Sequence, residues 1–354
     1  MSKKLLFPFL YLTFAIGCAK EEPEINAACE WRPNGTCLIK WETFPPMEGT
    51  VKVYESTHPD SFDLSSPIFE QDIQTGFRSV LSSSMSRMYF KLVFNRKYST
   101  IVAERTLNMQ GIFNFRDLGG YYNRENKQVQ WGKIYRSGSL SRATGYDRRM
   151  LSGLNIETHI DLRTEQESLC YPNKFRPPHV YNLPLRGNAH NIFFDEILSR
   201  KMQLQNILDY DREVFSFILE NNTDYLIRMF DVLLDEKNYP VIISCFLGKD
   251  RSAIASALIL SALDVDNEVI MDDYLLSNTL IDYRTLVPNA DNYPFDIQQT
   301  ITTLYSAHTE TLRHAFELIR VNYGSVNNYL EKELHLTSKK REKLKSILLT
   351  HSPR

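Results

Sequence analysis

The feature that most constrains the fold of this chain is a run of twenty residues, VIISCFLGKDRSAIASALIL (241–260). Its first six residues are a short apolar run suited to a buried strand, and the residues from Ser252 onward are mostly small and apolar, as in a buried helix. A strand that passes straight into a helix brings several backbone N–H groups and the positive end of the helix dipole to one point, which attracts anions. The sequence therefore predicts a phosphate-sized anion site at this turn.

Two side chains give the turn a candidate chemistry. Arg251 begins the predicted helix, where its planar guanidinium can hold two phosphate oxygens. Cys245 ends the predicted strand, and the pKa of a cysteine, about 8.5 when free, falls by several units beside a helix N-terminus and a cation. We expect Cys245 to attack a phosphomonoester as a thiolate, with Arg251 and the loop amides stabilising the transition state and Ser252 hydrogen-bonding the sulfur. The other expected substrate-binding residues are Phe246, Leu247, Gly248 and Lys249.

Two other interpretations of the turn compete with this one. A nucleotide-binding P-loop needs a glycine five residues before its Gly-Lys pair and a serine or threonine after the lysine, but Ile243 and Asp250 hold those places. A buried structural cysteine in an ordinary turn is the second alternative. The formal net charge of -2 gives no general reason to expect nucleic-acid binding, and we expect neither a cofactor nor a metal.

The N-terminus has the layout of a secretory signal. Two lysines precede an apolar run (5–16) that is too short to span a membrane. The run ends in AIGC, which resembles the lipobox at which bacteria attach diacylglycerol to the cysteine, although alanine stands where leucine is usual. We expect a lipoprotein signal peptide over residues 1–18 with a lipidated Cys18, and a tether over 19–28. Acyl chains such as palmitate would hold this exported bacterial lipoprotein on the periplasmic face or the cell surface of the outer membrane; a cleaved signal followed by a free cysteine is the alternative.

The length of 354 residues suits two domains. In residues 29–107, short runs of β-branched and aromatic residues are separated by turn residues, which predicts a small all-β sandwich similar to an immunoglobulin-like or fibronectin type III module. Cys29 and Cys37 flank a Pro-Asn-Gly turn signal, which is compatible with a disulfide across a hairpin. We interpret this domain as a spacer or as a docking module for an extracytoplasmic partner. The predicted strands are CLIKWE (37–42), VKVYES (51–56), MYFKLVF (88–94) and STIVAERTL (99–107).

Residues 108–354 alternate strand-like and helix-like segments, which predicts an α/β domain with a central sheet flanked by helices. The predicted strands are IETHIDL (156–162) and VIISCF (241–246). The predicted helices are YLIRMFDVLLDE (225–236), SAIASALILSAL (252–263), NEVIMDDYLLSN (267–278) and KKREKLKSILL (339–349).

The stretch CFLGKDRS resembles the active-site loop of the cysteine-dependent protein tyrosine and dual-specificity phosphatases. It is most similar to their bacterial secreted branch, whose loop contains Gly-Lys-Asp-Arg and which acts on phosphotyrosine and, in some members, on phosphoinositides. Ser244 stands where this family usually has a histidine before the nucleophile; serine can still hydrogen-bond the loop, so we expect a retuned cysteine rather than an inactive one. Five more blocks resemble the family in the same order: NFRDLGG (114–120), IYRSGSL (134–140), DLRTEQE (161–167), DDYLLSN (272–278) and YGSVNNYL (323–330).

Expelling a tyrosine oxygen requires a carboxylic acid beside the leaving group. Asp250 lies inside the loop, as in related lipid phosphatases, and Asp161 ends a predicted strand that points at the same pocket. We slightly prefer Asp250; the structural alternatives are a pair with Arg251 or a loop amide for Asp250, and with Arg136 or Arg163 for Asp161.

Three further residues or pairs have weaker expected roles. Lys249 could reach the pocket mouth and bind a second phosphate, or be a solvated loop lysine. Arg116 and Asp117 are expected to form a buried ion pair, and His190 to be a surface residue.

The resemblance implies a protein tyrosine phosphatase that forms a phosphocysteine and acts on a phosphotyrosine protein. The alternatives are a phosphoinositide or inositol phosphate phosphatase, and a non-catalytic surface protein that binds phosphorylated ligands or acts as an adhesin through its sandwich.

Overall fold

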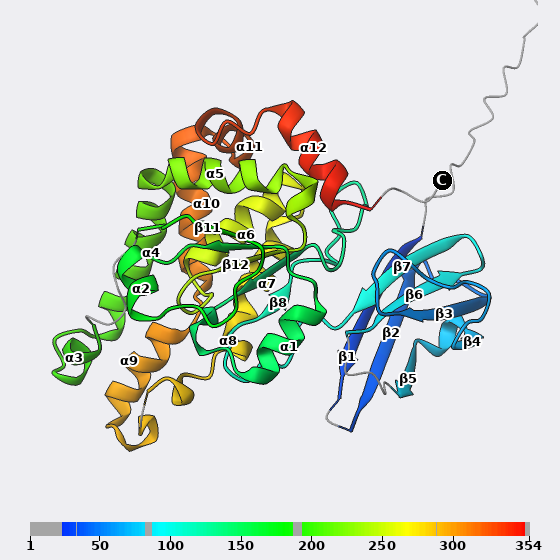
Figure 1. The fold of residues 1–354 in the computed structure, drawn as a ribbon, viewed down its shortest axis with the longest axis horizontal. Coiled ribbons are helices and arrows are strands. Elements are labelled where there is room, and N and C mark those ends of the chain that lie inside the picture. The colour runs from blue at the N-terminus through cyan, green and yellow to red at the C-terminus, as the bar shows by residue number, and fades with distance from the viewer. Residues whose placement is uncertain (1–22, 33, 82–86, 187–192, 288, 351–354) are drawn as a thin grey trace, which may run out of the picture.

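The structure is a computed structural model that describes residues 23–32, 34–81, 87–186, 193–287 and 289–350. The expected signal peptide, Cys18 and His190 lie outside the described residues. Figure 1 shows a smaller unit of strands, formed by the N-terminal part of the chain, beside a larger unit in which helices surround a sheet.

The smaller unit consists of two antiparallel sheets, with strand orders β1-β2-β5 and β4-β3-β6-β7. Side chains alternate between the two faces of each strand, and the buried ones from both sheets, among them Ile39, Trp41, Val53 and Leu92, form one core. The strands are β1 Glu24–Trp31, β2 Thr36–Phe44, β3 Thr50–Ser56, β4 Phe69–Asp72, β5 Phe77–Leu81, β6 Tyr89–Phe94 and β7 Tyr98–Ala103.

The predicted strands at 37–42, 51–56 and 88–94 are confirmed, and the one at 99–107 ends early, at Ala103. The expected tether over 19–28 is wrong for its second half, because β1 begins at Glu24. The polar composition of this segment suggested a tether, but its alternate residues Ile25 and Ala27 are partly buried against the core.

Cys29 and Cys37 are buried thiols in this structure rather than a disulfide. A hydrogen bond to Cys37 and burial both raise the pKa of the Cys29 thiol above its ordinary value.

The larger unit is built on a five-stranded sheet of order β11-β10-β12-β9-β8. The four strands from β11 to β9 are parallel, and β8 pairs with β9 in the antiparallel sense. Ile242 packs into an apolar cluster that also holds Leu151 of α1, whereas Ile243 packs into the larger cluster that holds α6. Because neighbouring strand residues face opposite ways, helices cover both faces of the sheet. The strands are β8 Arg116–Asp117, β9 Ile134–Ser137, β10 Thr158–Asp161, β11 His179–Asn182 and β12 Val241–Ser244.

The predicted helices are confirmed within a few residues, and the one over 267–278 is divided into α7 and α8. Every residue of α6 is buried, as expected for a helix that is apolar on all sides. In the described part of the chain, no helix is long and apolar enough to cross a membrane. The helices are α1 Gly145–Gly153, α2 Glu165–Cys170, α3 Phe193–Leu198, α4 Leu204–Asn221, α5 Thr223–Leu233, α6 Arg251–Ala262, α7 Asn267–Leu275, α8 Ser277–Leu280, α9 Phe295–Tyr305, α10 Thr309–Tyr323, α11 Val326–Asn328, a π-helix Tyr329–Glu333 and α12 Ser338–Leu348.

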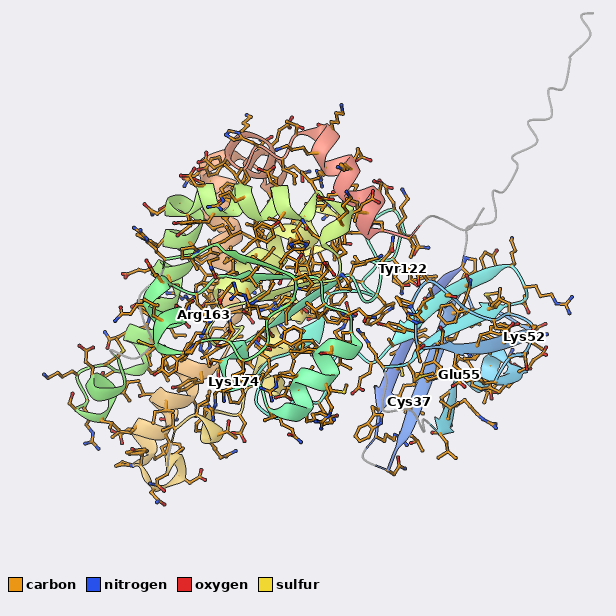
Figure 2. The ribbon with its side chains drawn as sticks, in the orientation of Figure 1. Cys37, Lys52, Glu55, Tyr122, Arg163 and Lys174 are labelled. Carbon is orange, nitrogen blue, oxygen red and sulfur yellow. The ribbon has the colours of Figure 1, made fainter. Side chains whose placement is uncertain are left out.

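The two units meet through a buried polar contact. Arg87, just before β6, donates to Asp117 of β8 over 2.6 Å and to the Tyr135 hydroxyl over 2.9 Å. Trp131 packs against Tyr89 beside this ion pair, and Figure 2 shows Tyr122 at the same junction. Since a buried ion pair depends on both partners staying in place, the smaller unit is fixed against the sheet of the larger one.

Candidate active site

The nucleophile candidate Cys245 directly follows β12, and Arg251 begins α6, as the sequence predicts. Ser137 of β9 and Asp161 of β10 lie level with Ser244 in the sheet register. The loop from Cys245 to Asp250 therefore lies at the carboxyl edge of the central strands, where sites in α/β sheets form.

The carbonyl groups of this loop are held by the segment around β8 and β9. Phe246 O accepts from the Ser139 amide over 3.0 Å. Gly248 O accepts from Asn114 Nδ2 over 2.7 Å and from Arg136 Nη2 over 2.8 Å. Because N–H and C=O point in opposite directions in a peptide group, these bonds turn the loop amides toward the inside of the loop.

The inside of the loop is suited to an anion. The amides of residues 246–249 donate to no acceptor within the described part of the chain. Cys245 is buried, and its Sγ lies 3.5 Å from Ser252 Oγ in the first turn of α6. Backbone donors, the helix N-terminus and the sulfur thus converge as expected for a phosphate site.

Gly248 is required by the shape of the loop. Its φ of 73° lies in the left-handed region, and a Cβ there would lie 2.5 Å from the carbonyl carbon of Ser137. An amino acid with a side chain would therefore be strained and too close to Ser137 at this position, so the loop requires glycine.

Arg251 is held ready by a carboxylate that the sequence interpretation did not identify. Its Nη1 and Nη2 donate to the two oxygens of Glu167 over 2.5 and 2.7 Å. Burial would lower the pKa of Arg251, but the hydrogen bonds and charge of Glu167 raise it above its ordinary value. Glu167 is fixed by a capping box with Thr164 at the start of α2. The Thr-x-x-Glu spacing inside DLRTEQE was the available sequence signal for this position.

A buried network below the loop holds Arg136 in place. Asp273 of α7 accepts from Arg136 Nη1 over 2.6 Å and from Arg116 Nε over 3.0 Å, and all three side chains are buried. The expected Arg116–Asp117 pair is therefore wrong. Asp117 pairs with Arg87 instead, because neighbouring residues of β8 point to opposite faces of the sheet.

The two candidate acids have different environments. Asp161 accepts four hydrogen bonds from three nitrogens of Arg163 and one from Asn173 Nδ2, the latter over 2.9 Å. Burial would raise the pKa of Asp161, but the Arg163 hydrogen bond holds it below its ordinary value. Asp161 is therefore an ionised structural anchor for Arg163. Asp250 lies in the loop itself at the start of α6, next to Arg251.

The expectation that Lys249 reaches the pocket mouth is wrong. Its side chain is 0% exposed, and its Nζ lies 3.4 Å from Asp211 Oδ2 and 3.2 Å from Asp250 Oδ1. It also donates to the carbonyls of Leu304 and Ser306 at the end of α9, each over 3.1 Å. Burial would lower the pKa of Lys249, but the two carboxylates raise it above its ordinary value. Lys249 therefore anchors the loop to α4 and α9.

Ser244 is linked to a histidine on the neighbouring strand. Its Oγ lies 2.7 Å from Nε2 of His159 in β10, and both side chains are buried. Burial lowers the pKa of His159 to about 4, so the imidazole is neutral near neutral pH. The residue before the nucleophile is thus fixed by a neutral imidazole supplied from β10.

Comparison with known proteins agrees with this geometry. Residues 107–350 match the model of the tyrosine phosphatase family. A Cupriavidus necator protein, whose name marks it as a candidate tyrosine-protein phosphatase, is 24% identical over 248 residues, 67% of this chain and 87% of that protein. The triple specificity protein phosphatase PtpB of Mycobacterium tuberculosis is 27% identical over 258 residues, 63% of this chain and 91% of that protein.

Among solved structures, the catalytic core of the PP-IP phosphatase Siw14 from S. cerevisiae, in complex with citrate, is 18% identical. The match covers 63% of this chain and 98% of that one, with a TM-score of 0.29. The family model covers the whole α/β unit from β8 to α12, and on that ground the chain belongs to the tyrosine phosphatase family.

Proposed function

We propose that the protein hydrolyses phosphomonoesters of tyrosine through a phosphocysteine intermediate on Cys245. The observation that carries the proposal is the loop after β12, whose carbonyls accept hydrogen bonds from outside the loop while the amides of residues 246–249 donate to no acceptor in the described part of the chain. Membership of the tyrosine phosphatase family supports the same reaction class.

In the first proposed step, Cys245 Sγ attacks the phosphorus as a thiolate and the ester P–O bond breaks. Arg251 and the loop amides bind the equatorial oxygens, on which charge accumulates in the transition state. Asp250 gives its proton to the departing tyrosine oxygen, so that the leaving group departs as a neutral phenol.

In the second step, water attacks the phosphocysteine while the Asp250 carboxylate accepts a proton from that water. The S–P bond breaks, and inorganic phosphate and the Cys245 thiolate result. Ser252 Oγ, 3.5 Å from the sulfur, supports this step by donating a hydrogen bond to the departing thiolate.

The proposal is tested by turnover of a phosphotyrosine peptide and of a phosphoinositide. Wild type should release phosphate from the peptide, and Cys245→Ser should lose about a thousandfold or more in kcat/KM. Cys170→Ser is the matched control, because Cys170 is exposed and outside the loop. Equal activity of wild type and Cys245→Ser would remove the phosphocysteine mechanism, and a wild type that binds but never hydrolyses would identify a phosphate-binding surface protein.

The acid is tested by comparing Asp250→Asn with Asp161→Asn. The Asp250 variant should lose about a hundredfold or more on substrates with poor leaving groups, together with the basic limb of its pH–rate profile. The Asp161 variant should lose stability through release of Arg163. The opposite pattern would make Asp161 the acid.

We further propose that the protein is an exported lipoprotein anchored through Cys18 on the periplasmic face or the surface of the outer membrane. The support is the N-terminal sequence, with its lysines, apolar run and AIGC. In a bacterial host, mass spectrometry of the mature N-terminal peptide should find an acylated Cys18, and Cys18→Ser should release the protein from membranes. An unmodified Cys18 in membrane-free protein would contradict the anchor.

For the N-terminal unit we propose an immunoglobulin-like or fibronectin type III sandwich that serves as a spacer or docks an extracytoplasmic partner. The orders of its three-stranded and four-stranded antiparallel sheets support this class. An experimental structure of the full chain with any other strand order would refute it.

A further inference from the structure

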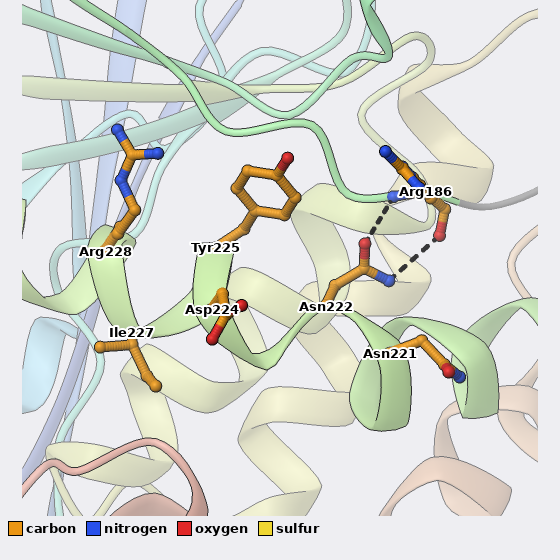
Figure 3. A pocket seen from close by; sticks show the side chains of 7 residues that line it. All are labelled: Arg186, Asn221, Asn222, Asp224, Tyr225, Ile227 and Arg228. Carbon is orange, nitrogen blue, oxygen red and sulfur yellow. Dashed lines mark hydrogen bonds between the residues drawn. The ribbon is translucent and has the colours of Figure 1, made fainter.

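A basic recess of about 650 Å³ lies between the chain after β11 and the start of α5. Arg186, which follows β11, forms one side, and Tyr225 and Arg228 of α5 form the other. Figure 3 shows the two guanidinium groups and the tyrosine hydroxyl directed to the same side of α5. The recess therefore presents two cations and a hydroxyl to a common space.

The recess lies at the same edge of the sheet as the phosphate loop. Arg186 comes after the carboxyl end of a strand parallel to β12. The helix α5 leads back to the start of β12, so its own first turn lies at the opposite, carboxyl edge. The carbonyl of Leu162 joins the two sites, because it accepts from the Leu185 amide over 3.1 Å and from Arg251 Nη1 over 3.5 Å.

Asn222 builds the recess by fixing Arg186. Its Oδ1 accepts from the Arg186 amide over 2.7 Å and its Nδ2 donates to the Arg186 carbonyl over 3.2 Å (Figure 3). Asn222 is buried and precedes α5, yet its side chain does not cap that helix. The position of Arg186 is thus defined by a buried side chain, and the α5 N-terminus keeps its positive potential.

Among the residues that the structure describes, no carboxylate pairs with the two arginines of the recess. Within the described chain, the guanidinium groups of Arg186 and Arg228 form no ion pair, and both residues are exposed. Asp224 is the one carboxylate among the lining residues, and Figure 3 shows it directed away from the tyrosine hydroxyl. Two planar forks and a phenolic donor are the groups that bind a phosphate dianion well.

We propose that Arg186, Tyr225 and Arg228 bind a second phosphate group of the substrate while its first phosphate lies in the Cys245 loop. The inference rests on the proposed phosphatase function and names its preferred substrate class, a compact molecule with two phosphomonoesters. Only β10 separates β11 from β12, and the Leu162 carbonyl contacts a group of each site, so the substrate class that we test is a compact one, a phosphorylated inositol ring. Lys249, which the sequence suggested for a second phosphate, is buried and lies beside Asp211 and Asp250 instead.

The test compares kcat/KM for a soluble inositol bisphosphate with that for the corresponding monophosphate. Arg186→Gln and Arg228→Gln should each lower the ratio of the two values by about tenfold or more, because each removes a charged hydrogen-bond donor. Tyr225→Phe should lower the ratio by about twofold to tenfold. Arg78→Gln on exposed β5, which changes the net charge equally, should leave the ratio as in wild type.

A second measurement separates this inference from the proposed function. In a Cys245→Ser background, calorimetric affinity for the bisphosphate should fall by the same factor in the arginine variants, whether or not the wild type turns it over. A ratio and an affinity unchanged by both arginine substitutions would overturn the subsite, as would equal losses on monophosphate and bisphosphate.

Two further arms identify the source of the phosphate. Vesicles that carry a bisphosphorylated phosphoinositide should show the same ratio effect as the soluble headgroup. If the Arg186 and Arg228 substitutions lower activity only on vesicles, the arginines bind the anionic membrane surface and the subsite is refuted. If they lower activity only on an acidic phosphotyrosine peptide, the recess binds peptide side chains and the subsite is likewise refuted.

Discussion

Replacement of Asp273 by asparagine should both unfold the protein more easily and disturb the phosphate loop. Asp273 Oδ1 accepts from Arg116 and from the Tyr121 hydroxyl, and its Oδ2 accepts from Arg136 over 2.6 Å. An asparagine side chain offers one oxygen in place of two and turns an N–H₂ group toward a guanidinium. Two buried arginines would then share no counter-charge.

The expected loss of unfolding free energy is about 3–5 kcal/mol, the cost of breaking a buried ion pair by removing one partner. For a unit of this size, a loss of 1 kcal/mol lowers Tm by about 2–4 °C, so a fall in Tm of about 10 °C is expected. Arg136 also donates to the Gly248 carbonyl, so kcat/KM should be lower than in wild type even at temperatures well below Tm, where the variant is still folded. Thermal unfolding by circular dichroism and turnover of p-nitrophenyl phosphate measure the two effects.

Asp266→Asn is the matched control, at the residue that precedes the same helix. Its ion pair with Arg124 is exposed on both sides, so its loss should cost less than about 1 kcal/mol. Equal small losses for both variants would refute the view that Asp273 neutralises a buried pair of arginines. The pH dependence of stability gives a further check. Burial would raise the pKa of Asp273, but the charges of Arg116 and Arg136 lower it below its ordinary value. Its contribution is complete above a pH of about 3.9 and is lost as the pH falls toward the folded-state pKa, so the gap between wild type and variant should narrow in acid.

Three other substitutions address the loop. Gly248→Ala should lower kcat/KM by about a hundredfold, measured on p-nitrophenyl phosphate, because the added Cβ displaces the loop backbone; normal activity would contradict the required left-handed conformation. Lys249→Met should lower the unfolding free energy by about 3–5 kcal/mol in a urea titration, because the buried charge facing Asp211 is removed; a change confined to KM for doubly phosphorylated substrates would contradict this. Wild type should lose about 1 kcal/mol of stability per pH unit between about pH 6 and 4, because His159 is protonated there only when unfolded. His159→Gln should lack that slope, and a wild-type slope in the variant would show that His159 does not titrate in this way.

The sequence identified the parts of the fold whose signals are local. The apolar run of β12 and the small-residue helix α6 were predictable because burial on all sides requires continuous apolar residues. Strand β1 was missed because it is an edge strand with only its inner face covered. Its alternate polar residues are typical of a solvent-facing side, and they resemble a tether in composition.

The residues of the site also separate into those that a local sequence signal identifies and those that it does not. Cys245, Arg251 and Gly248 are close in sequence, so their spacing alone indicates their arrangement. His159 approaches the loop from β10 and Glu167 from the first turn of α2, and only the tertiary structure reveals that they do. The parallel pairing of β10 with β12 is a long-range property that no local pattern encodes.

The position of Lys249 shows why sequence position within a binding loop does not determine a side chain's role. A lysine beside an anion site would be expected to face the anion, yet its ammonium faces Asp211 and the carbonyl end of α9, where the helix dipole is negative. The loop is thereby bound on one side by Lys249 and on the other by Asn114 and Arg136. With its backbone fixed on both sides, the loop is organised for phosphate before the substrate arrives, so binding need not order it. Lys249 is thus not available for a second phosphate, and we propose Arg186 and Arg228, outside the loop, for that role.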